Sequence, residues 1–273
     1  MAAAATNEAE RRRWNDEYWA SVWPSREQLT DAVTDVLLGH LGLAAGQRVL
    51  DVGSGGGRTA LAVARRVGAT GSVVGADISR PLVRYATSRA EEQGVANVRF
   101  VVADAQSESI DGAPFDAAAS QFGVMFFEEP RTAFANIRAH TVPGGSLAFA
   151  CWQPADRNPW HAGHAVGRFL EPPPPPAPGK SPTGPFSLGD ATRTAEVLAA
   201  AGWAGVERTP YELPVTVEQE AIAIDDAQLA FMGIPDSQLD EARRAVDRHV
   251  AGLRRDDGRC DVVLAFQVFT ATA

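Results

Sequence analysis

The sequence predicts an α/β fold built on a parallel sheet. Short apolar runs alternate with amphipathic helical segments between residues 47 and 152, and a glycine-rich turn follows the first run. A helix between two strands makes a right-handed crossover, so consecutive strands are expected to be parallel. With 273 residues, 45% of them hydrophobic, the chain is long enough for one such domain with segments that cover it.

Apolar periodicity and turn residues give each element in order. Residues 1–45 predict helices: aromatic residues cluster at helical spacing from Trp14 to Trp23, and this run ends before Pro24. We expect strands at residues 47–52, 72–76, 98–103, 115–122, 146–152, 206–217 and 261–271. Further helices are expected at residues 58–67, 81–93, 131–140, 190–201 and over most of 218–255, with Asp190 as an N-cap. The proline run 172–176 predicts an extended, exposed loop.

Composition excludes several classes of function. The formal charge is −9 and no basic stripe offsets it, which argues against nucleic acid as a partner. No window of 18 apolar residues occurs and the N-terminus lacks an apolar signal region, so neither a membrane span nor a signal peptide is expected. Cys151 and Cys260 lie in apolar runs and are interpreted as buried, reduced thiols of a cytoplasmic protein. No spacing of Cys, His, Asp or Glu residues is typical of a metal site, so no metal is expected. The sequence is compatible with either a monomer or a homodimer.

The glycine-rich turn from Gly53 to Gly57 is the sharpest motif. Glycines let the backbone approach a ligand, and the N-terminus of the helix that follows favours a carboxylate or phosphate. Residues 55–60 match a dinucleotide fingerprint, but such a match alone is weak. Asp51 precedes the first glycine by two residues, and its charge would repel a pyrophosphate but attract an ammonium group. A ligand with both ammonium and carboxylate groups, such as the methionine part of S-adenosylmethionine, therefore fits better.

Two more acids end the next two strands. Asp77 follows the second predicted strand and Asp104 the third. Carboxyl ends of parallel strands meet along one rim, where open α/β sheets bind ligands. A carboxylate at Asp77 can accept both ribose hydroxyls, and one at Asp104 can accept from the exocyclic amine of adenine.

With these motifs the chain resembles a class I S-adenosylmethionine-dependent methyltransferase. The stretch 120–127, together with residues 143–145 and 151–153, is similar to the bacterial small-molecule branch related to the ubiquinone/menaquinone C-methyltransferases. The resemblance implies a Rossmann-like, seven-stranded, mostly parallel sheet whose last strand is antiparallel. It also implies an N-terminal helical lid at 1–45, and a methyltransferase domain at 46–273 with substrate-cap insertions at 153–188 and 218–258.

The resemblance assigns cofactor roles to residues of this chain. It places the methionine part of the cofactor against the turn, at Asp51, Gly53, Ser54, Gly55 and Gly57. The ribose would bind Asp77 at the end of the second strand, and the adenine would contact Ile78, Asp104 and Ala105. The sulfonium would lie beside Gln121 and Phe122 at the end of the fourth strand.

Two further candidates concern the acceptor side. His161 follows the fifth strand beside Trp160, and histidine titrates near neutral pH, so it is the candidate catalytic base if the acceptor must lose a proton. The alternative is a loop histidine. The aromatic N-terminus is interpreted either as a lid, with Tyr18 touching the cofactor, or as a helix packed on the sheet or a second subunit.

The predicted function is O- or C-methylation of a small molecule. We further expect this reaction to belong to bacterial secondary metabolism. The alternatives keep the same fold and cofactor pocket as a scaffold or for a cyclisation. A nicotinamide-dependent oxidoreductase is less favoured, because the only lysine, Lys180, lies beside the proline-rich loop and makes no Tyr-x-x-x-Lys pair.

Overall fold

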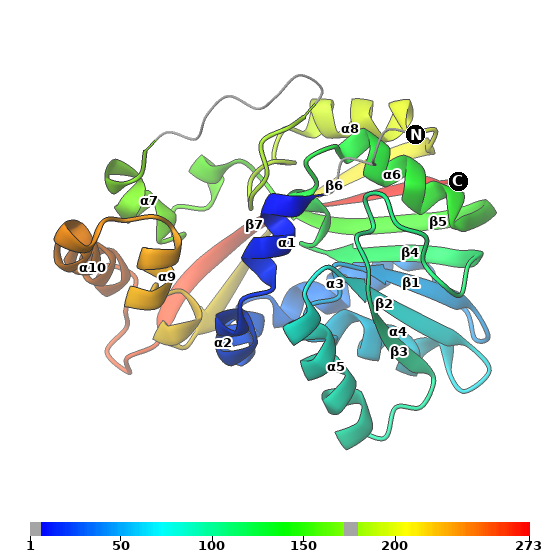
Figure 1. Ribbon diagram of the computed structural model, residues 1–273, viewed down its shortest axis with the longest axis horizontal. Coiled ribbons are helices and arrows are strands. Elements are labelled where there is room, and N and C mark those ends of the chain that lie inside the picture. The colour runs from blue at the N-terminus through cyan, green and yellow to red at the C-terminus, as the bar shows by residue number, and fades with distance from the viewer. Residues whose placement is uncertain (1–6, 172–179) are drawn as a thin grey trace.

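The computed structural model describes residues 7–171 and 180–273, and its centre is a seven-stranded sheet (Figure 1). The strand order is β3-β2-β1-β4-β5-β7-β6. Strand β7 runs antiparallel to both of its neighbours, and the other pairs are parallel. This confirms the predicted sheet and its antiparallel last strand. The strands are β1 (Arg48–Val52), β2 (Ser72–Asp77), β3 (Val98–Val102), β4 (Phe115–Gln121), β5 (Thr141–Trp152), β6 (Ala204–Val217) and β7 (Cys260–Thr272).

Helices lie on both faces of the sheet (Figure 1). Helices α3 and α4 contact each other, α6 and α8 form a second contacting pair, and α5 packs on β2 and β3. The bounds are α3 (Asp31–Leu41), α4 (Arg58–Val67), α5 (Arg80–Glu92), α6 (Pro130–Ala139) and α8 (Ala191–Ala200). The side chain of Asp190 accepts from the backbone N–H of Arg193 at 3.1 Å, which confirms the predicted N-cap of α8.

The core lies where the central strands are covered on both sides. Residues Ala117, Ala118 and Ala119 of β4 are fully buried, and so are Val49 and Leu50 of β1. These strands read as continuous apolar runs because a parallel sheet hides both of its faces. Cys151 and Cys260 are buried and free, as predicted.

Two groups of helices lie outside this frame. A first group, α1 (Glu8–Trp14) and α2 (Glu17–Gln28), crosses in front of the sheet. A second group lies beside the far ends of β6 and β7 (Figure 1) and contains α7 (Gly163–Val166), α9 (Asp226–Phe231) and α10 (Asp236–Ala251). We call the first group the lid and the second the cap. In the described part of the chain, no helix has the length and apolar character needed to cross a membrane.

The structure differs most from the sequence prediction at the end of α2 and at the start of β5. Helix α2 continues through Pro24 to Gln28, and its last turn is fixed by an ion pair between Glu27 and the guanidinium of Arg89 at 2.6 Å. Strand β5 begins at Thr141 rather than at residue 146, since Thr141 pairs with Phe115; the next pair joins Ala117 to Ser146, so the extra residues form an irregularity in β5. The predicted proline loop at 172–176 lies outside the described residues.

Candidate active site

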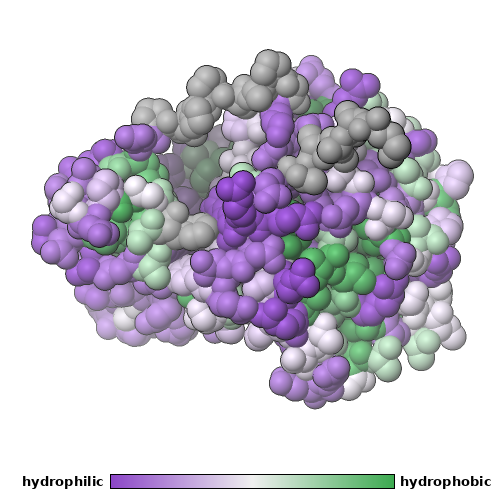
Figure 2. All heavy atoms as spheres, in the orientation of Figure 1, coloured by the Kyte–Doolittle hydropathy of each residue, from purple (hydrophilic) through white to green (hydrophobic). Residues whose placement is uncertain are grey.

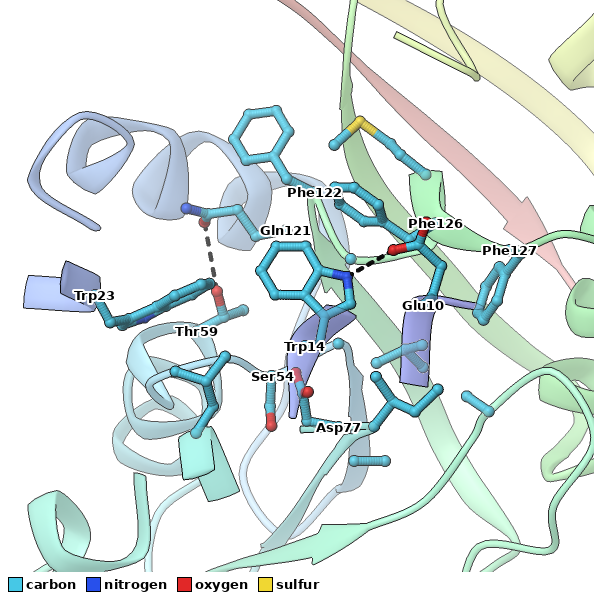
Figure 3. A pocket seen from close by; sticks show the side chains of 18 of the residues that line it. Glu10, Trp14, Trp23, Ser54, Thr59, Asp77, Gln121, Phe122, Phe126 and Phe127 are labelled. Carbon is cyan, nitrogen blue, oxygen red and sulfur yellow. Dashed lines mark hydrogen bonds between the residues drawn. The ribbon is translucent and has the colours of Figure 1, made fainter. Parts of the chain in front are cut away.

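A cavity of about 260 Å³ lies at the carboxyl ends of β1, β2 and β4, under the lid (Figure 3). Tertiary folding brings together residues from three strand ends that the sequence separates by up to about 70 positions. Eight residues predicted to contact a cofactor line this cavity: Gly53, Ser54, Asp77, Ile78, Asp104, Ala105, Gln121 and Phe122. Four do not line it: Tyr18, Asp51, Gly55 and Gly57.

Glycines of the turn are required by close backbone packing. Gly53 has φ +67°, and a Cβ there would lie 2.6 Å from the Cα of Gly123. Gly57 has φ +84° and begins α4, and a Cβ there would lie 2.7 Å from the ring of Phe100. The turn therefore brings the end of β1 against the end of β4 and holds α4 close to β3.

Asp77 is held rigidly at the end of β2. One carboxylate oxygen accepts from the N–H of Gly55 at 2.8 Å, and the other accepts from the N–H of Ser79 at 2.8 Å. Burial raises the pKa of Asp77, while these backbone bonds favour its charged form. A carboxylate has about four acceptor positions, so both oxygens retain capacity for two ligand hydroxyls.

Asp51 is buried behind the turn. Within the described part of the chain, neither of its carboxylate oxygens has a hydrogen-bond partner, and the same holds for the hydroxyl of Ser54. Burial, with the negative charge of Asp77, raises the pKa of Asp51 to about 7. Unpartnered buried acceptors need a donor from water or from a ligand. Asp51 does not reach the cavity surface, so its charge would act on an ammonium group of a ligand through the turn rather than by direct contact.

The end of β4 supplies an amide and a strained aromatic residue. The carbonyl oxygen of Gln121 accepts from the hydroxyl of Thr34 at 2.9 Å, and its NH₂ group donates to the carbonyl of Thr30 at 3.1 Å. Phe122 has φ +62°, which is costly for a residue with a side chain and is typical of functional sites. Its ring stacks on that of Trp152, with centroids 4.1 Å apart. Trp152 also lines the cavity, and sequence reasoning missed it.

Lid residues form the outer wall of the cavity. The indole of Trp14 projects into it and donates to the buried carboxylate of Glu10 at 2.9 Å (Figure 3). The indole of Trp23 covers the turn: a Cβ at Gly55 would lie 2.3 Å from its ring. The outer face over α1 and α2 is largely hydrophilic (Figure 2), so the aromatic face of these helices is the inner one. The aromatic run in the sequence was the signal for this wall, but it did not identify which rings face inward.

Tyr18 has a different position from the one expected. Its hydroxyl donates to Asp225 at 3.1 Å and so connects α2 to the residue that begins α9. Burial and the neighbouring carboxylate raise the pKa of Tyr18 to about 12. In this structure Tyr18 joins the lid to the cap, and its contact with a cofactor stays a prediction.

His161 also lies away from the cavity wall. Its Nδ1 accepts from the N–H of Gly163 at 3.1 Å, and its ring packs edge-on against Trp160 and Phe186. Burial lowers the pKa of His161 to about 4, so the ring is neutral at physiological pH. A single ring, Trp160, separates it from Trp152 of the cavity. Its catalytic role stays a prediction.

Two acids and a glycine turn that meet in one cavity at the carboxyl ends of the strands are typical of the ligand-binding rim of an open α/β sheet. Residues 49–145 match the methyltransferase domain family. Aklanonic acid methyltransferase DauC of Streptomyces sp. (strain C5) is 33% identical over 104 residues, which are 38% of this chain and 47% of DauC. The ubiquinone/menaquinone biosynthesis C-methyltransferase UbiE of Ectopseudomonas oleovorans is 33% identical over 139 residues, 46% of this chain and 82% of that protein.

Among solved structures, the [4+2]-cyclase SpnF superposes with a TM-score of 0.54 at 24% identity, covering 89% of this chain and 80% of that protein. That likeness concerns the fold. The chain belongs to the class I S-adenosylmethionine-dependent methyltransferases of the UbiE-like type. It spans about half the length of DauC, the first of the relatives above.

Proposed function

We propose that the protein transfers a methyl group from S-adenosylmethionine to a small-molecule acceptor, on oxygen or carbon. The observation that carries this proposal is the convergence of Asp77, Asp104 and the Gly53 turn on one cavity at the sheet rim. The names of the relatives, which refer to aklanonic acid and to ubiquinone and menaquinone, support an acceptor of small-molecule size.

In this proposal the cofactor lies along the rim. Asp77 accepts the ribose hydroxyls, Ile78 and Ala105 pack on adenine, and Asp104 accepts its amine. The turn of Gly53, Ser54, Gly55 and Gly57 surrounds the methionine part, with Asp51 behind it balancing the ammonium group. Gln121 and Phe122 lie beside the sulfonium. The unpartnered oxygens of Ser54 and Asp51 support this placement.

Bound S-adenosylmethionine supplies an already activated methyl group. The task of the chain is therefore to position the two reactants and exclude water, and proximity alone can lower a barrier by roughly 7–11 kcal/mol. Trp14 and Trp23 of the lid close the outer side, and Trp152 with Phe122 form an apolar wall. This lining favours an acceptor with an aromatic or otherwise apolar body.

The remaining assignments belong to the same proposal. Residues 1–45 act as a lid on the 46–273 methyltransferase domain, and the insertions 153–188 and 218–258 enclose the acceptor. His161 acts as base if the acceptor is a hydroxyl. We place the protein in the cytoplasm, as a monomer or homodimer without nucleic-acid or membrane partners, in secondary metabolism.

Replacement of Asp77 tests the cofactor assignment. Asp77→Ala should weaken S-adenosylmethionine binding by about 1.5–3 kcal/mol in calorimetry, because hydrogen bonds to a charged acceptor are lost. Asp256→Ala, at an exposed acid of the loop before β7, is the matched control and should bind like the wild type. Wild-type affinity in Asp77→Ala would contradict the ribose assignment.

Labelled S-adenosylmethionine separates the proposal from its alternatives. Incubation with a panel of phenolic and quinoid small molecules should give a labelled product. Cofactor binding with an acceptor rearranged but never labelled would instead support a cyclisation on the same fold. Saturable NADH binding at micromolar concentration would support the oxidoreductase.

A further inference from the structure

Asn7, the residue before α1, carries a buried amide that the proposed function leaves without a role. It lines the cavity and only 3% of it is exposed. Its NH₂ group donates to the carbonyl of Phe126 at 3.1 Å, which fixes the orientation of the amide because a carbonyl needs a donor. The other atom, Oδ1, is buried and makes no hydrogen bond to any residue that the structure describes.

This oxygen is not used to begin the helix. Asn7 occupies the N-cap position of α1, where an asparagine oxygen normally accepts from an N–H of the first turn. Here no side-chain cap bond forms, and only the main-chain carbonyl of Asn7 accepts, from the N–H of Arg11 at 2.8 Å. A buried acceptor without its usual partner calls for a donor other than the residues that the structure describes.

The neighbour of Asn7 in the cavity is a second acceptor. The backbone N–H of Asn7 donates to Asp104 Oδ2 at 3.3 Å, and Asp104 Oδ1 accepts from the N–H of Gln106 at 2.9 Å. Each carboxylate oxygen can accept more than one hydrogen bond, so Asp104 keeps capacity for a ligand. Asn7 and Asp104 are therefore in contact, and together they offer acceptors for a ligand group that has two N–H bonds on one nitrogen.

We propose that Asn7 Oδ1 and Asp104 together accept the two hydrogens of the adenine amino group, so that Asn7 selects adenine over a 6-oxopurine. The inference rests on the proposed function, since it assigns Asp104 to the adenine end. A 6-oxo group would present an oxygen to two acceptor oxygens and leave both without partners. Sites built to bond a donor reject analogues that lack it much more strongly than apolar pockets reject a size change.

The selecting residue belongs to the lid rather than to the sheet. Asn15, between α1 and α2, attaches the same segment to the rim: its NH₂ donates to the carbonyl of Ile78 at 3.0 Å, and its Oδ1 accepts from the N–H of Arg80 at 3.0 Å. Both amide atoms of Asn15 are therefore paired within the chain. Asn15 therefore attaches the lid to the rim but has no unpaired oxygen that could accept from a ligand. This makes Asn15 a matched control for Asn7.

The test compares binding of S-adenosyl-L-homocysteine and S-inosyl-L-homocysteine by calorimetry. We expect the wild type to favour the adenine compound at least about 100-fold. Asn7→Ala should lower this ratio about tenfold, mainly through weaker binding of the adenine compound, because one hydrogen bond is lost. Asn7→Ser should give the same fall, although serine is a favourable N-cap residue and should keep the start of α1 in place. Asn15→Ala should weaken both compounds equally and leave the ratio within twofold of the wild type.

Each contrary result has its own meaning. An unchanged ratio in Asn7→Ser and Asn7→Ala would show that Asn7 only anchors α1, and would overturn the inference while the cofactor assignment stands. The same holds if the wild type binds the two compounds alike. If the wild type binds neither compound, the proposed function fails, and the role of Asn7 fails with it.

Discussion

At the residue scale, the buried acids determine how this site responds to pH. Burial raises the pKa of both Asp51 and Asp77, and the negative charge of Asp77 raises the pKa of Asp51 further. An acid whose folded pKa is raised holds its proton in the folded state at pH values where the unfolded chain has already released it. Burial of both carboxyl groups therefore makes the ligand-free protein less stable as the pH rises.

The first prediction concerns this pH dependence. For Asp51, whose pKa rises from 3.8 to about 7, the unfolded state releases its proton first as the pH rises, so stability should fall between about pH 4 and pH 7 and then level off. Between pH 5 and pH 7 the loss should be about 2–3 kcal/mol, at 1.36 kcal/mol per unit. Urea unfolding of ligand-free protein at both values measures it.

Asp51→Asn should remove most of that slope, because an amide does not titrate. Asp256→Asn, at an exposed acid, should keep it. A slope of the same size in Asp51→Asn and in the wild type would show that Asp51 is ionised at pH 5 in the folded protein.

His161 permits a prediction about catalysis. If the acceptor is a hydroxyl, His161→Ala should lower kcat about 10²- to 10⁴-fold, the usual effect of losing a general base. Because burial holds the pKa of His161 at about 4, the wild-type rate should rise through that pH and stay flat from pH 6 to 8. His164→Ala, which changes the exposed neighbour, is the control. A loss below about threefold with a confirmed hydroxyl acceptor would leave His161 a structural residue.

At the element scale, α2 and the glycine turn depend on each other. A Cβ at Gly56 would lie 2.4 Å from the Trp23 indole and 3.0 Å from the ring of Tyr85. The φ of Gly56 lies outside the left-handed range, so the absence of a side chain there is required by contact rather than by backbone conformation. The Trp23 indole is thus the neighbour that a new side chain would displace.

Gly56→Ala should therefore destabilise the protein by about 1–3 kcal/mol, the usual cost of an added group in a tight contact. In the double variant with Trp23→Ala, part of that loss should be recovered, since the ring that collides is gone. Thermal unfolding of the four proteins in a double-mutant cycle measures the coupling. Gly39→Ala, where a Cβ meets nothing within 4 Å, is the control. Additive losses would mean that Gly56 and Trp23 do not contact each other.

At the scale of the whole molecule, the lid connects the rim of the sheet to the cap, which lie far apart in the sequence. On one side Asn15 and Arg11 bond to the rim, at Ile78 and Glu108. On the other, Tyr18 bonds to Asp225 before the cap helix α9. Between these attachments, Trp14 and Trp23 of α1 and α2 line the cavity.

Local sequence patterns were sufficient to predict most of the secondary structure. The seven strands, the turn and the acids at the ends of β2 and β3 were predicted within a few residues, because apolar periodicity and glycine spacing are properties of neighbouring residues. The predicted boundaries were wrong at Pro24 and Thr141: helix α2 continues past the proline, with Glu27 in its last turn paired to Arg89, and Thr141 joins β5 through its strand partner Phe115. Such partners are distant in sequence.

The site residues also fall into those that the sequence predicted and those that only the tertiary structure identified. Eight predicted cofactor residues line the cavity because each lies at the carboxyl end of a strand or in the turn, and parallel strands must bring those ends together. Which lid residues face inward was decided only by tertiary structure. Asn7, Trp14 and Trp23 reach the cavity while Tyr18 turns to the cap, because the path of α1 and α2 depends on hydrogen bonds to rim and cap residues more than 60 positions away.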